Sequence, residues 1–75
     1  MFDFCLLSLS GRDSYYIINV RLRKILSVID SFPTSGQFDA VAIIEVKQLI
    51  EIKEVANQIQ KISGVERTET MIEVQ

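Results

Sequence analysis

Residues 35–46, SGQFDAVAIIEV, place one carboxylate between a turn of small residues and a strongly apolar segment. Gly36 permits backbone conformations that other residues avoid, and Asp39 stands directly before the apolar run. A carboxylate in this position accepts hydrogen bonds, and in many hairpin turns the donors are local backbone amides. A second polar pair, Thr68 and Thr70, lies in an alternating segment, where threonine is also typical of an edge strand.

Few other residues of the chain have catalytic or metal-binding chemistry. Histidine is absent, and the 10 acidic residues show no pairing that indicates acid/base catalysis. Cys5 is the only cysteine, which excludes an internal disulfide and a thiolate metal cluster. It lies in an apolar run, where a small buried hydrophobe in a reducing, cytoplasmic compartment is expected. We therefore predict no catalytic residue, no metal ligand and no cofactor.

The composition indicates one small domain, residues 1–75, that associates with another chain. With 48% hydrophobic residues in 75 positions, the chain has more apolar side chain than a small core needs, and the surplus is expected at an interface. A net charge of −2 argues against direct binding of nucleic acid. The start, MFDFCLLSLSG, lacks the basic region of a signal peptide, and no apolar run is long enough to span a membrane.

The first half of the chain contains one clear element and one ambiguous one. Residues 2–9 are apolar on both alternating faces, which is typical of a central strand. Residues 15–24 contain β-branched and aromatic residues that favour a strand. They also show helical spacing, with N-cap candidates before them and a cationic end suited to a helix C-terminus. The residues concerned are Asp13 and Ser14 (N-cap), Tyr15, Ile18, Leu22 and Ile25 (spacing), and Arg21, Arg23 and Lys24 (cationic end).

The second half is easier to interpret. Strands are expected over residues 26–34 and 39–46, and Pro33 confines the first of them to a sheet edge. A helix is expected over 47–63, ended by Gly64. Its core-facing stripe is Leu49, Ile52, Val55, Ala56, Ile59 and Ile62. A last strand from Glu66 onward places Thr68, Thr70, Ile72 and Val74 on one face.

The resulting order is βαββαβ, if residues 15–24 are taken as a helix. This order predicts an α+β, ferredoxin-like fold, with a four-stranded antiparallel sheet and two helices on one face. In that fold the first and third strands are central, which agrees with their apolar character on both faces. The helix-free face then remains apolar, and leaving a few hundred Å² wet costs several kcal/mol at about 25 cal/mol per Å². A self-complementary dimer of the α+β-barrel type is therefore expected.

Several ferredoxin-like families are inconsistent with the residues present, and the fold alone does not decide function. A copper chaperone needs a pair of cysteines in a CxxC motif. An RNA-recognition motif needs exposed aromatic residues within a basic surface. An acylphosphatase-like enzyme needs a phosphate cradle after the first strand, for which Gly11 and Arg12 alone are insufficient.

The segments SGQFDAVAIIEV and ISGVERTETMIEV resemble the effector-binding (RAM) domain of the Lrp/AsnC transcription regulators. The first is similar to the family's turn of Gly-x-aromatic-Asp, and the second to its Gly-Val-x-x-Thr-x-Thr ending. The resemblance covers residues 35–74, whereas residues 1–34 match only in element order. Family regulators carry an N-terminal helix-turn-helix domain, for which 75 residues leave no room. A stand-alone form of the effector-binding module is therefore expected.

The resemblance implies an amino acid or related metabolite as ligand, bound between assembled dimers. The implied ligand-binding residues are Gly36, Gln37, Phe38, Asp39, Thr68 and Thr70. Gly36 would let backbone amides approach the ligand carboxylate, and Asp39 would accept hydrogen bonds from its ammonium group. The implied partners are further copies of the chain, as a dimer or a ring, and full-length Lrp/AsnC regulators. Two alternatives stay open: a structural interaction module without a ligand, and a small enzyme of the same fold.

Overall fold

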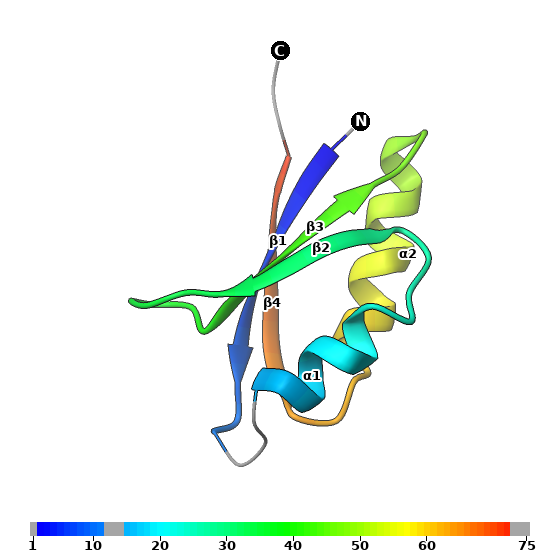
Figure 1. Cartoon of the computed structure of the whole chain (residues 1–75). Helices are drawn as coiled ribbons and strands as arrows, with labels where there is room; N and C mark the ends of the chain where they lie inside the picture. Colours follow the sequence, from blue (N-terminus) through cyan, green and yellow to red (C-terminus); the bar gives the residue numbers. More distant parts are fainter. Residues whose placement is uncertain (1, 12–14, 73–75) are drawn as a thin grey trace.

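The computed structural model describes residues 2–11 and 15–72. The elements follow the order β1 (Phe2–Leu9), α1 (Tyr15–Leu22), β2 (Val28–Pro33), β3 (Ala40–Glu45), α2 (Leu49–Gln60) and β4 (Val65–Ile72) (Figure 1). This order confirms the predicted βαββαβ layout. The N-cap candidates Asp13 and Ser14, and the strand residue Val74, lie outside the described residues.

The four strands form one antiparallel sheet in the order β2-β3-β1-β4. The two strands that are apolar on both faces are therefore central, as predicted. Pro33 ends β2, an edge strand, where the missing N–H removes no hydrogen bond from the interior of the sheet. β2 is shorter than the predicted 26–34, because Leu26 belongs to the preceding loop.

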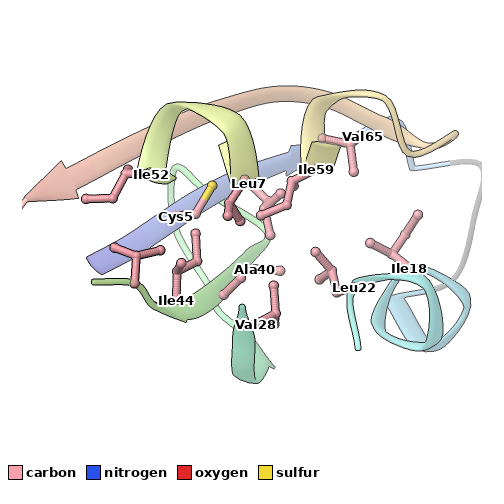
Figure 2. Close-up of a cluster of buried hydrophobic side chains, with 13 residues drawn as sticks. Cys5, Leu7, Ile18, Leu22, Val28, Ala40, Ile44, Ile52, Ile59 and Val65 are labelled. Atoms are coloured by element: carbon pink, nitrogen blue, oxygen red, sulfur yellow. The ribbon is translucent and has the colours of Figure 1, made fainter. Parts of the chain in front are cut away.

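The hydrophobic core lies between one face of the sheet and the two helices (Figure 2). Alternation along β1 sends Cys5 and Leu7 into this core and turns the even-numbered residues to the other face. Cys5 is fully buried, as expected of a small hydrophobe. The core consists of Cys5, Leu7, Ile18, Leu22, Val28, Ala40, Ala42, Ile44, Val46, Ile52, Val55, Ile59 and Val65.

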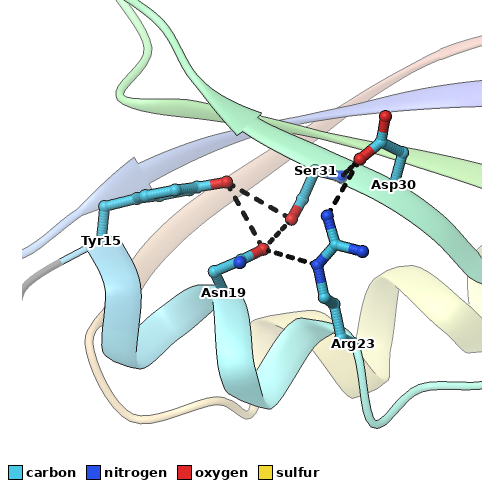
Figure 3. Close-up of polar contacts among 5 residues, drawn as sticks. All are labelled: Tyr15, Asn19, Arg23, Asp30 and Ser31. Carbon is cyan, nitrogen blue, oxygen red and sulfur yellow. Dashed lines mark hydrogen bonds and ion pairs between the residues drawn. The ribbon is translucent and has the colours of Figure 1, made fainter.

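A row of polar side chains explains why residues 15–22 form a helix despite their β-propensity (Figure 3). Tyr15, Asn19 and Arg23 are spaced four residues apart, so helical geometry places them on one side. The Tyr15 hydroxyl lies 3.4 Å from both Asn19 Oδ1 and Ser31 Oγ, and the Ser31 hydroxyl donates to Asn19 Oδ1. Arg23 Nε donates to Asn19 Oδ1 at 3.3 Å and its Nη2 to Asp30 Oδ1 at 3.0 Å. The row thus joins α1 to β2.

The cationic end of α1 has specific partners as well as solvent. Arg21 Nη1 donates to the carbonyl oxygen of Ser63 at 2.8 Å, which joins α1 to the turn after α2. Arg23 forms the ion pair with Asp30. Arg23 and Lys24 lie just beyond the last helical residue, Leu22.

Helix α2 is shorter than the predicted 47–63 and buries part of the predicted stripe. Ile52, Val55 and Ile59 are buried, and Ala56 and Ile62 are half-buried. The prediction that Leu49 packs in the core is wrong, since 55% of it is exposed. Leu49 is the first residue of α2, which begins shortly after β3 ends at Glu45. The prediction that Gly64 ends the helix is wrong, because α2 ends at Gln60 with Lys61 as its C-cap. Gly64, with φ at 101°, lies instead in the turn directly before β4.

Candidate functional site

The loop between β2 and β3 is held against the end of β1 by backbone hydrogen bonds. The N–H of Thr34 donates to the carbonyl oxygen of Asp39 at 2.9 Å, and the N–H of Asp39 donates to that of Leu7 at 2.8 Å. The Thr34 hydroxyl also donates to the carbonyl oxygen of Phe38 at 2.7 Å. Gly36 has φ at 111°, in the region that favours glycine. These contacts fix the position of residues 34–39, which include four of the predicted ligand-binding residues.

The side chain of Asp39 binds the backbone of a neighbouring strand. Its Oδ2 accepts a hydrogen bond from the N–H of Leu9 at 2.8 Å. The donor is 30 residues away along the chain, so this hydrogen bond joins the loop to the end of β1 and does not lie within the loop. Asp39 remains exposed, and solvent-borne ligands can still reach its carboxylate.

A cation lies beside this loop. The guanidinium carbon of Arg67 on β4 is 6.0 Å from the centre of the Phe38 ring, within range of a cation–π contact. Arg67 was absent from the residues predicted to bind a ligand. The sequence does place Arg67 on the polar face of an alternating segment, on the other side of the strand from Thr68, and this pattern could have indicated it. The loop and the neighbouring strand β4 thus bring together an aromatic ring, a carboxylate and a guanidinium group.

The two threonines lie on the other side of the sheet. Thr68 and Thr70 pair with Leu7 and Cys5 of β1, so their side chains share the helix-facing side. The Thr68 hydroxyl donates to Gln60 Oε1 of α2 at 3.1 Å. Gln60 Nε2 in turn donates to the carbonyl oxygen of Glu66 at 2.9 Å. Within one protomer the structure therefore does not bring the threonine side chains to the loop of residues 34–39.

The face of the sheet opposite the helices is apolar at its centre, as the sequence predicts; we call it the open face. Its margins carry charges, because Glu45 pairs with Phe2, Glu69 with Leu6 and Arg67 with Ser8. Phe4 lies at its centre, between Ile43 of β3 and Met71 of β4. Leu6 faces Val41 in the next row, and Val41 in turn faces Phe32 of β2. Both described helices lie on the other side (Figure 1). Four large side chains of the open face are exposed: Phe2, Phe4, Phe32 and Met71.

A buried carboxylate on the helix-facing side was not predicted. Asp3 is fully buried, and neither of its carboxylate oxygens has a hydrogen-bond partner in the described part of the chain. Burial raises its pKa above the usual value. Burial, and to a lesser extent the Asp3 charge, raises the pKa of the Cys5 thiol to about 12. Cys5 is therefore a protonated thiol near neutral pH and not a nucleophile.

Two further properties are stated for residues 2–11 and 15–72. Their acidic and thiol side chains form no group of three that could hold a metal ion. None of their helices is both long and apolar enough to cross a membrane.

Comparison with known proteins identifies the family. The sequence matches the Lrp/AsnC ligand binding domain over residues 4–75, and the chain belongs to this family. Among solved structures, the protein TTHA0845 from Thermus thermophilus has a TM-score of 0.89 at 27% identity, over 99% of this chain and 92% of that one. The resemblance drawn from the two sequence segments is therefore confirmed. A comparison with curated proteins gives no match.

Two longer neighbours share the fold. E. coli AsnC has a TM-score of 0.88 at 23% identity, over 99% of this chain and 50% of that one. A feast or famine regulatory protein from M. tuberculosis, in complex with L-methionine, has a TM-score of 0.83 at 18% identity, again over 99% and 50%. The chain thus spans half the length of these two proteins, and the likeness shows a common fold.

Proposed function

We propose that this chain is an effector-binding and assembly domain of the Lrp/AsnC type. Copies associate through the open face, and an amino acid or related metabolite binds beside the loop of residues 34–39. The observation that carries the proposal is the open face itself, in a member of a ligand-binding family. Fully burying one such phenylalanine or methionine contributes about 1.5–3 kcal/mol, so the exposed set favours association strongly.

The loop offers complementary groups for a zwitterion. Arg67, held over the Phe38 ring, is placed to attract a carboxylate, and the exposed side of Asp39 can accept from an ammonium group. Gly36 leaves the backbone open, since no atom lies within 4 Å of the position of a Cβ there. A neighbouring subunit would close this surface into a pocket. Gln37, also exposed, completes the proposed contact set on the loop.

Thr68 and Thr70 are proposed to contact the ligand under one further condition. The Thr68 hydroxyl is bonded to Gln60, so a ligand must displace that contact to use it. Thr70 lies on the same helix-facing side of the sheet. Participation of the two threonines therefore requires a ligand that enters between β4 and α2.

Mixed assembly with full-length regulators is the regulatory part of the proposal. The chain matches half of each of the two longer neighbours. Chains that share this fold and its association face can form mixed assemblies even when their lengths differ. Such mixing would change the number of effector sites per assembly. We further propose that the domain performs no catalysis, in line with a family defined by ligand binding.

Two measurements test the proposal. Light scattering should give a solution mass of at least two chains, and a strictly monomeric chain would contradict association through the open face. A thermal-shift panel of the common amino acids should show stabilisation by at least one, because a ligand that binds only the folded state raises its stability. A panel without any shift would contradict the ligand-binding half.

The second candidate function is an interaction module without a ligand. It is favoured by the bonds that already occupy Asp39 and Thr68 within one protomer. The same panel separates the two candidates, because the second predicts association together with no shift for any amino acid.

A further inference from the structure

Pairing through the open face leaves many large apolar side chains uncovered. Besides Phe2, Phe4, Phe32 and Met71, six others come from the helices and the loop that follows α1: Tyr16, Ile17, Val20, Leu26, Leu49 and Ile50. Leu26 is 98% exposed and Tyr16 is 78% exposed. An apolar set of this kind on a second surface is typical of a second contact.

The first part of this surface is the outer side of α1, defined by Tyr16, Ile17 and Val20. The inner side of the same helix buries Ile18 and Leu22. A helix that is apolar on both sides is typically covered on both sides. We call this the α1 outer face.

The second part is a groove of ≈ 490 Å³ at the other end of β3 from residues 34–39. Its apolar walls are Leu26, Ile29 and Val46, and its remaining lining residues are Ser27, Glu45, Lys47 and Glu51. The first turn of α2, which contains Glu51, also exposes Leu49 and Ile50. With two carboxylates and one ammonium group, the groove has a net charge of −1 (−2 + 1 = −1).

A cation beside the α1 outer face is opposite in sign to the net charge of the groove. Lys24 is the second residue after α1, and its side chain forms no ion pair with any described residue, in contrast to Arg23 with Asp30. Glu45 and Glu51 are likewise without an ion pair in the described chain. Opposite charges around apolar centres favour association in one orientation.

We propose that the α1 outer face of a second copy docks on this groove. Its apolar side chains lie against Leu26, Ile29 and Val46, and Lys24 lies near Glu51. The segment that follows α1 forms one wall of the groove, so the two parts adjoin. One two-fold axis can therefore place each α1 on the groove of the other copy. The α1 outer face lies on the helix side of the sheet, away from the open face, and the groove borders the open face only at Glu45, which pairs with Phe2.

The test uses the full chain with the open face blocked by Phe4→Asp, or by Met71→Asp if the first variant does not fold. Sedimentation over a concentration series should still show a monomer–dimer equilibrium. Added to this background, Lys24→Glu and Glu51→Lys should each raise the dissociation constant at least fivefold. The double reversal should restore most of the affinity. Lys61→Glu, the same charge change at the far end of α2, is the matched control and should have little effect.

Three results would overturn the proposal. One is a strictly monomeric state of the variant whose open face is blocked, a result that leaves the proposed function intact. Another is a double reversal that associates no better than the single ones. The third is an equal effect of Lys61→Glu, which would assign the change to net charge. Circular-dichroism melting of every variant confirms that folded chains are compared.

Discussion

The carboxylate of Asp39 accepts the backbone N–H of Leu9 at 2.8 Å, across 30 residues of sequence. Asp39→Ala leaves this amide without its acceptor and should lower the free energy of unfolding by about 1 kcal/mol. In a domain of this size that corresponds to about 4–8 °C in Tm. Asp39→Asn keeps an oxygen acceptor and should lie between the alanine variant and the wild type.

The same pair of variants separates structure from binding at Asp39. If the carboxylate also binds an effector ammonium group, Asp39→Asn should lose most of the ligand-induced thermal shift with little loss of basal Tm. An unchanged ligand shift in this variant would remove Asp39 from the proposed contacts.

Asp3 should make stability depend on pH. Because burial raises its pKa in the folded state, the fold binds the Asp3 proton more tightly than the unfolded chain does. The free energy of unfolding therefore falls as pH rises from 3.8, the ordinary pKa, through the folded-state pKa. Asp3→Asn removes the charge and should melt a few degrees above wild type at neutral pH. The difference in Tm should shrink towards pH 3.8, and a constant difference would contradict this account.

Phe4 lies at the centre of the open face, between Ile43 and Met71. Phe4→Asp places a charge in the proposed interface and should weaken that association by a hundredfold or more, since losing a buried phenylalanine alone costs about 3 kcal/mol. Size-exclusion chromatography with light scattering measures the loss of mass. Gln58→Asp, at an exposed position on α2, is the control. Equal masses for wild type and Phe4→Asp would argue against the open face.

Gly36 has φ at 111° with no atom within 4 Å of a Cβ position. Gly36→Ala should therefore destabilise through backbone strain and not through a clash, by about 1–2 kcal/mol. Chemical denaturation measures the change, and Ser35→Ala in the same loop should be nearly neutral. A neutral Gly36→Ala would mean that the loop adopts another conformation at little cost.

Two positions of α2 test how its apolar stripe is divided. Ile59 is fully buried and Leu49 is 55% exposed, although both fit one helical spacing. Ile59→Ala should cost about 2–5 kcal/mol, whereas Leu49→Ala should change the free energy of unfolding of the monomer by less than about 0.5 kcal/mol. Urea denaturation at low protein concentration provides both values. Similar losses at the two positions would show that Leu49 is covered after all.

The sequence was sufficient to predict the fold because several of its signals agreed. Two strands apolar on both faces, Pro33 in a third and a clear helical stripe around Val55 allow few arrangements other than βαββαβ. Residues 15–24 were ambiguous from propensity, and only the order of elements favoured a helix. The reason visible in the structure is tertiary: Asn19 and Arg23 bind Ser31 and Asp30 of β2.

The site was less predictable, because its contacts join residues distant in sequence. No local pattern shows that Arg67 lies over Phe38, or that Thr68 faces Gln60. The sequence shows Asp3 two residues before Cys5, on the same alternating face of the strand, but does not show that its carboxylate is buried without a partner. Alternation predicts which face a side chain occupies, but the partners on that face depend on strand order and register.

The two outer strands carry features that discourage growth of the sheet. β2 ends in Pro33, whose nitrogen has no hydrogen to offer, and β4 exposes Glu66, Arg67 and Glu69 along its length. A further strand from another molecule would meet a missing donor on one margin and a row of charges on the other. Under the proposed association through the open face, copies of this chain would stack broad side to broad side and form particles of finite size instead of fibrils.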